Sequence, residues 1–153
     1  MQPFYEVYCQ TMQTRHDEIL KALNGLPPKA LDWVSGPGMN SISVMVFHLT
    51  GAERYWIGDI AAQESSNRDR EAEFKVHDVT MDVLKKRLDD NLVYARKALE
   101  KFTLQDLEAP RVVPRDGSSV TAGRALLHAL EHMTLHLGHI QITRQLWDQK
   151  AGR

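Results

Sequence analysis

Residues 126–147, LLHALEHMTLHLGHIQITRQLW, limit the possible folds of this chain more than any other stretch. The segment contains neither proline nor a turn signal, so it predicts a continuous helix about 33 Å long at 1.5 Å per residue. One face of that helix is apolar because the apolar residues recur every three or four positions, at Leu126, Leu130, Met133, Leu137 and Ile140. The stretch therefore predicts a long amphipathic helix that packs against a core.

Three further segments have the same helical period. The first covers about 3–24, the second about 40–64 with Asn40 or Ser41 as its N-cap, and the third follows Thr80. Their apolar residues in helical rhythm include Phe4, Val7, Ile19, Leu20 and Leu23 in the first; Ile42, Met45, Leu49, Trp56 and Ile60 in the second; and Leu84, Leu88, Leu92, Leu99 and Phe102 in the third. Ser119 or Thr121 is the predicted cap of the fourth.

Polar or proline- and glycine-containing connections separate these segments. Residues 63–79 predict a solvated crossover, and RVVPRDGSSV predicts a short extended pair about Asp116-Gly117. Four such helices favour an all-α fold, a four-helix bundle forming a single domain over 1–153. A less regular orthogonal α domain is the alternative, and connections of this length permit antiparallel neighbours or crossovers.

Composition excludes several classes of partner. The formal net charge is −1, which provides no electrostatic reason to expect nucleic acid or an anionic membrane. No apolar run is long enough for a membrane span, and the N-terminus shows no secretory signal. Cys9 is the only cysteine, so no intrachain disulfide can form, and a cytoplasmic setting is expected.

Four of the seven histidines lie in 126–147. His132 and His136 are four residues apart and share one flank of the helix, where their neighbours are small residues. His128 and His139 lie further from the core direction, so they are expected to be exposed or outer members of a site. A third imidazole, His48, occupies a similar flank of the second segment. His48, His132 and His136 thus predict a three-histidine metal site between two helices, with open positions typical of catalysis.

The histidines also have a non-metal interpretation, because imidazoles at helix edges often only hydrogen-bond to backbone or water. His16 and His77 have no histidine near them in the pattern and are predicted to be surface residues. Cys9 is interpreted as a small helix residue and not as a ligand or nucleophile.

Two motifs resemble those of the DinB-like superfamily of DinB/YfiT-type bundles: SISVMVFHLTGAERYWIGDI and HMTLHLGHIQITRQLW. The resemblance implies an up-down-down-up bundle, commonly dimeric, that binds zinc or nickel through His48, His132 and His136. His139 departs from the commoner glutamine at its position. Glu53 belongs to the motif and is interpreted as a buried pairing residue, with Arg144 as its expected partner.

Characterised relatives of that superfamily include metal-dependent thiol transferases and an isomerase that use low-molecular-weight thiols such as mycothiol or bacillithiol, and many other relatives have no known reaction. The resemblance therefore implies a thiol S-transferase or hydrolase that acts on a small molecule, with four residues proposed around the metal ligands: His128, His139, Tyr55 and Asp59. The alternatives are a non-catalytic metal-binding or stress-associated module and a bundle that binds no metal. A second apolar face with Leu127, Leu135 and Ile142 predicts a homodimer.

Overall fold

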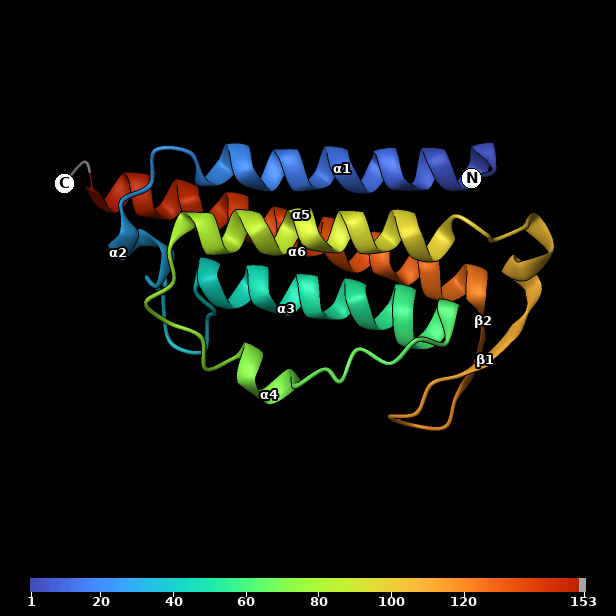
Figure 1. Ribbon diagram of the computed structural model, residues 1–153. Coiled ribbons are helices and arrows are strands. Elements are labelled where there is room, and N and C mark those ends of the chain that lie inside the picture. The colour runs from blue at the N-terminus through green and yellow to red at the C-terminus, as the bar shows by residue number, and fades with distance from the viewer. Residues whose placement is uncertain (152–153) are drawn as a thin grey trace.

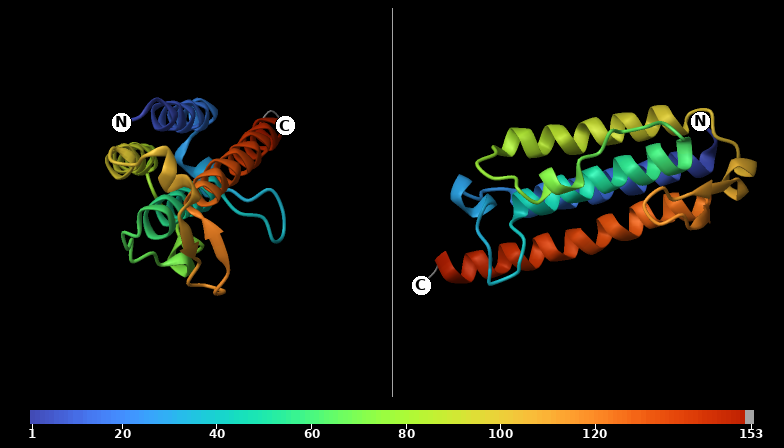
Figure 2. Two further views of the ribbon diagram at one scale, coloured as in Figure 1. Left: turned by 90° about the vertical axis from the view of Figure 1, so that its right-hand side faces the viewer. Right: turned by 90° about the horizontal axis from the view of Figure 1, so that it is seen from below.

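The computed structural model describes residues 1–151, and four long helical rods dominate that part of the chain (Figure 1). They are α1 (Pro3–Leu23), α3 (Ile42–Arg54) with its continuation η1 (Tyr55–Ala62), α5 (Met81–Leu99) and α6 (Ala122–Ala151). Figure 1 shows α1 and α6 running in one direction and α3 and α5 in the other, which confirms the up-down-down-up bundle. Each of α5 and α6 packs against both α1 and α3, and the end view in Figure 2 shows the four rods surrounding one core.

Short elements connect the rods. They are α2 (Pro28–Leu31), α4 (Arg70–Glu73), η2 (Leu104–Glu108) and the antiparallel pair β1 (Pro110–Val112) and β2 (Ser119–Thr121). The predicted extended pair is confirmed, and Gly117 adopts a φ of +71° in its turn, where glycine is favoured. No helix within residues 1–151 combines the length and hydropathy that crossing a membrane requires.

The helix starts follow the predicted capping chemistry. The Ser41 side chain accepts a hydrogen bond from Val44 N at 3.2 Å, and Thr80 Oγ1 accepts one from Val83 N at 3.4 Å. Thr121 Oγ1 accepts from Arg124 N at 3.1 Å, so of the two predicted caps of α6 it is Thr121 that acts. Each oxygen satisfies a backbone N–H that the first helical turn leaves unpaired.

The end of the second rod differs from the predicted α-helix. Tyr55–Ala62 forms a π-helix, whose wider turns rotate the residues that follow them. Ile57 is therefore fully buried, whereas Trp56, expected in the apolar stripe, is only half-buried. The same rotation places the Trp56 ring 4.3 Å from the ring of His128.

The buried face of α1 also differs from the expected one. Phe4 and Val7 are exposed, whereas Tyr5, Tyr8 and Met12 are buried. The Tyr5 hydroxyl donates to Thr103 O at 2.6 Å, and the Tyr8 hydroxyl donates to Leu126 O at 3.0 Å. Both rings therefore pack in the core and still satisfy their polar ends.

A buried polar layer separates two apolar clusters of the core. His16, predicted at the surface, has only 2% of its area exposed, and its Nε2 donates to both carboxylate oxygens of Glu53, at 3.1 and 3.2 Å. Asn91 Nδ2 donates to the same carboxylate at 2.9 Å. Glu53 is buried as expected, but its partner is His16; Arg144 instead donates to Ala22 O and Asn24 O. His16 is buried because it continues the helical spacing of the buried residues of α1, between Met12 and Ile19.

His16 is expected to make stability depend on pH. Burial alone lowers its pKa, but Glu53, with smaller contributions from Asp17 and Asp89, outweighs burial and raises the pKa above 6.5. A raised folded-state pKa contributes stability below pH about 6.5 that is lost as the pH rises through the folded-state value. The difference in Tm between the wild type and His16→Gln, which keeps an N–H donor but cannot titrate, should be larger at pH 6 than at pH 9. Equal differences at the two pH values would contradict a charged His16.

Candidate metal centre

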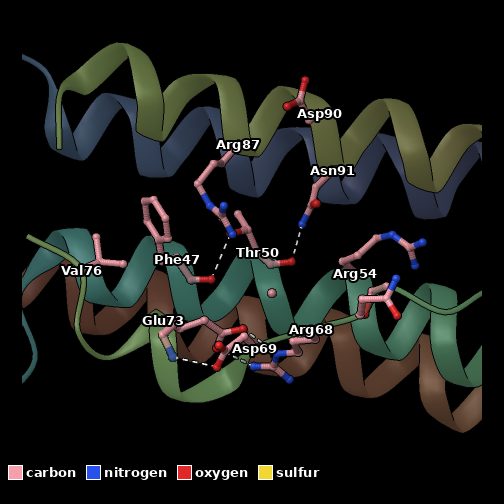
Figure 3. Close-up of a pocket in the computed structure, with 14 residues that line it drawn as sticks. Phe47, Thr50, Arg54, Arg68, Asp69, Glu73, Val76, Arg87, Asp90 and Asn91 are labelled. Carbon is pink, nitrogen blue, oxygen red and sulfur yellow. Dashed lines mark hydrogen bonds and ion pairs between the residues drawn. The ribbon is translucent and has the colours of Figure 1, made fainter.

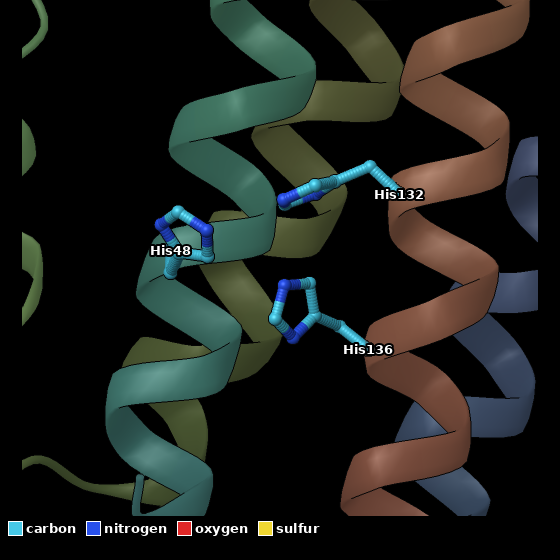
Figure 4. A group of neighbouring side chains, drawn as sticks. All are labelled: His48, His132 and His136. Carbon is cyan, nitrogen blue, oxygen red and sulfur yellow. The ribbon is translucent and has the colours of Figure 1, made fainter.

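The three predicted ligands meet between α3 and α6. His48 on α3 faces His132 and His136, which lie one turn apart on α6 (Figure 4). Each residue offers one nitrogen, and the three nitrogens lie within 4.8 Å of one another. The centroids of the His48 ring and the other two rings are 5.0 and 5.1 Å apart, and those of His132 and His136 are 4.5 Å apart. Helices that run side by side thus bring together residues far apart in the sequence.

The environment keeps two of these imidazoles neutral. Burial, reinforced by neighbouring imidazoles, lowers the pKa of His132 to about 3 and that of His136 to about 4. The ring lone pairs are therefore available at neutral pH, as metal ligation requires. Nδ1 of each ring is buried and has no hydrogen-bond partner within residues 1–151. A set of three imidazole nitrogens is a donor set that suits a divalent metal ion, so this cluster could bind one.

Glu73 orients the third imidazole. Its Oε2 lies 3.0 Å from His48 Nδ1, so we assign the proton to Nδ1, which leaves the Nε2 lone pair free for a metal. Arg68 holds the same carboxylate through Nε at 2.6 Å and Nη2 at 2.7 Å. Burial raises the pKa of Glu73, but Arg68 and His48 outweigh it and lower the pKa below its usual value. The carboxylate thus stays ionised and fixes the His48 ring.

The sequence prediction missed Glu73 and Arg68, because residues 63–79 were expected to be solvated throughout. In the structure this crossover contains α4, which brings Glu73 against α3 and buries it. Gly51, three residues after His48, makes the approach possible: a Cβ there would overlap Glu73 Oε1 and Cδ and lie 3.2 Å from Arg68 Nε. A glycine within an otherwise regular helix was the one available signal of this contact.

Replacing Glu73 by glutamine is expected to weaken metal binding by about 10- to 100-fold, the usual effect of removing a carboxylate behind a metal-bound histidine. Glutamine keeps the shape but loses the charge that orients His48 and Arg68. Gly51→Ala should weaken binding in the same direction by displacing the Glu73 side chain. Competition with a chromophoric chelator measures both affinities, and the exposed Glu71→Gln is the matched control. Unchanged affinity in Glu73→Gln would contradict an orienting role.

The four residues proposed around the ligands lie at different places. The His128 ring lies 6.0 Å from His132, and the His139 ring lies 5.3 Å from His136. Tyr55 packs edge-on against Trp56. Asp59 accepts hydrogen bonds from Ser66 N and Oγ, which ties the crossover to η1. The parts that these four residues play in any chemistry stay predictions.

Comparison with known proteins places the chain in a family. The family model described as mycothiol-S-transferase matches residues 9–149. The chain belongs to the mycothiol-S-transferase family. The family match extends from α1 to the last turns of α6 and so includes all three clustered histidines. Among curated protein sequences, none matches this chain.

Solved structures show the same DinB/YfiT-like fold at low sequence identity. A conserved protein from Enterococcus faecalis is 15% identical, with 95% of this chain and 98% of that chain covered and a TM-score of 0.78. YfiT from Bacillus subtilis, described as a probable metal-dependent hydrolase, is 16% identical, with 95% and 89% covered and a TM-score of 0.76. A DinB-like protein from Bacillus cereus is 16% identical, with 96% and 92% covered and a TM-score of 0.74.

Proposed function

We propose that this protein is a metal-dependent S-transferase that joins a low-molecular-weight thiol to a small electrophilic substrate. The observation that carries the proposal is the convergence of His48, His132 and His136, with one nitrogen from each within 4.8 Å of the others. Family membership supports mycothiol as the thiol. Three protein ligands leave coordination positions for a further group, as in catalytic sites.

Zinc or nickel is the proposed ion, because imidazole nitrogen suits both metals. When bound, such an ion supplies Lewis acidity, which lowers the pKa of a thiol or water beside it and provides a nucleophile near neutral pH. His48, His132 and His136 would hold the ion, and Glu73 would keep His48 in the required tautomer.

The surrounding side chains are suited to accept the proton of the thiol and to shape the substrate site. Burial, with Arg124 adding to it, lowers the pKa of His128, so this imidazole is neutral at pH 7 and can accept a proton. Burial raises the pKa of Tyr55, so its phenol stays protonated and can donate a hydrogen bond. Phe74, whose ring centroid is 4.8 Å from that of His48, and Trp56 beside His128 offer apolar surface to an electrophile.

A turnover screen tests the proposal. Protein loaded with zinc or with nickel is mixed with mycothiol, bacillithiol or glutathione and a panel of small electrophiles, and conjugate formation is followed by mass spectrometry. We expect conjugation that needs both metal and thiol and is fastest with mycothiol. Fully metal-loaded protein that forms no conjugate from any pair would overturn the transferase proposal.

Two alternatives use the same ligands and give different outcomes. In a hydrolase, water occupies the open position, so product forms without thiol. In a non-catalytic metal-binding or stress-associated module, removing the metal lowers the Tm but there is no activity to lose. The screen separates all three when it includes thiol-free reactions and melting curves with and without metal.

We further propose that the protein is a homodimer that pairs through the outer face of α6. Leu127, Leu135 and Ile142 are 54%, 57% and 50% exposed there, and the neighbouring Gly138 leaves that face open. Exposed apolar patches of this kind mark interaction surfaces. Sedimentation velocity should show a dimer for the wild type and a monomer for Leu135→Glu. The matched control is Val93→Glu, at an exposed position of α5, which should remain a dimer. A monomeric wild type would remove the proposal.

A further inference from the structure

A cavity of about 430 Å³ is lined by Arg68 and Glu73, among other residues, and by no histidine. Figure 3 shows its three walls: α3 with Phe47 and Thr50, α5 with Arg87 and Asn91, and the crossover with Arg68 and Glu73. Its volume is in the range of small-molecule sites. Glu73 lines this cavity and also contacts His48 Nδ1 at 3.0 Å, so the Arg68–Glu73 pair stands between the cavity and His48.

One arginine that lines this cavity, Arg87, makes no ion pair within residues 1–151. Arg87 Nε donates to Thr50 Oγ1 at 3.2 Å, and its guanidinium lies 3.9 Å above the Phe47 ring. Within residues 1–151 no carboxylate lies within 4.0 Å of it, and its two terminal nitrogens make no hydrogen bond there. Burial lowers the pKa of Arg87, which nevertheless stays cationic at neutral pH. Thr50 and Phe47 thus fix the position of the guanidinium, and its two terminal nitrogens are free to donate hydrogen bonds to a ligand.

The other charges that line the cavity are already engaged. Arg54 pairs with Asp59 at 3.5 Å, and Arg68 pairs with Glu73 at 2.6 Å. Lys86 pairs with Asp90 at 2.6 Å, and the Asp69 side chain caps α4 by accepting from Ala72 N at 3.0 Å. Of the three arginines that line the cavity, Arg87 is therefore the one without an ion pair to a described residue.

We propose that this cavity binds a small organic monocarboxylate. Its carboxylate accepts one hydrogen bond from each of the two terminal nitrogens of Arg87, the paired geometry in which guanidinium and carboxylate match. Its apolar part lies along Phe47 and Val76, which both line the cavity. A phosphate dianion fits less well, because Glu73 and Asp90 line the same space and repel a second negative charge. The proposal is independent of the metal-centre function.

The test uses benzoate as the probe, with benzamide as its uncharged analogue and phenyl phosphate as the dianion. Amide signals of the ¹⁵N-labelled full chain are followed by NMR with and without zinc. Benzoate is expected to shift the signals of Thr50, Gly51 and Asn91 in both forms and to bind more tightly than either analogue. A shift confined to residues beside His132 and His136, or seen only with zinc, would overturn the proposal, as would tighter binding of phenyl phosphate.

Two variants locate the charge that holds the probe. Arg87→Gln is expected to weaken benzoate binding by about tenfold or more, the loss typical of a hydrogen bond to a charged group. Lys85→Gln removes an exposed positive charge from the same helix and should leave the affinity unchanged. Equal weakening in both variants would show only a general charge effect and would overturn the proposal. If Arg87→Gln does not fold, the wild-type NMR shifts decide: the proposal requires that benzoate shift the amide signals of Thr50, Gly51 and Asn91.

Discussion

The His132→Ala variant is expected to lose stoichiometric zinc or nickel, and with it all metal-dependent activity. His132 supplies one of only three protein ligands, and the two that remain, His48 and His136, lie on different helices. Since removing a group behind a ligand already costs about 10- to 100-fold in affinity, removing the ligand itself should cost more than about 100-fold. Elemental analysis after loading and dialysis measures the bound metal, and the thiol-conjugation assay measures the activity.

His77→Ala is the matched control, because His77 is exposed and its side chain pairs with its neighbour Asp78, away from the histidine cluster. That variant should bind metal like the wild type. His139→Ala is a second comparison, since His139 lies next to His136 in space but outside the cluster. If His132→Ala retained full metal content while His139→Ala lost it, the ligand assignment would be wrong.

The Glu53→Ala variant is expected to lose about 3–5 kcal/mol of unfolding free energy, the cost typical of removing one partner of a buried ion pair. Glu53 accepts hydrogen bonds from His16 on α1 and Asn91 on α5. Its removal leaves the buried His16 Nε2 without an acceptor, whereas Asn91 Nδ2 keeps its bond to Thr50 O at 2.6 Å. Urea unfolding of the metal-free protein measures the change without interference from metal binding. A loss of this size is a large share of a domain's stability.

Glu71→Ala provides the reference, because Glu71 is exposed on α4 and meets only Lys75 at 3.9 Å. Its unfolding free energy should stay within about 0.5 kcal/mol of the wild type. Full stability in Glu53→Ala would mean that water or a rearranged core satisfies His16, and the buried polar layer would then not contribute to the stability of the bundle.

Helix-level predictions succeeded where the signal is local. Ser41, Thr80 and Thr121 act as caps because a side-chain oxygen needs only the following turn of its own helix. The apolar stripe of α6 is buried at Leu126, Met133 and Ile140, because one face of a long helix must be covered. The predicted side-chain directions are wrong after Tyr55, because a π-helix does not turn by 100° per residue.

The sequence alone was sufficient to single out His48, His132 and His136, since each lies on a regular helix whose directions follow from its period, and the family motifs carry the same residues. It also determined the class of fold. Only the tertiary structure decided which groups surround that cluster and which line the neighbouring cavity. The path of the crossover positions Arg68 and Glu73, and the packing of α3 against α5 positions Arg87. Contacts of this kind leave no periodic pattern in the sequence, so they could not be predicted from it. The same holds for His16 and Glu53, because a pairing across helices depends on how the helices are aligned.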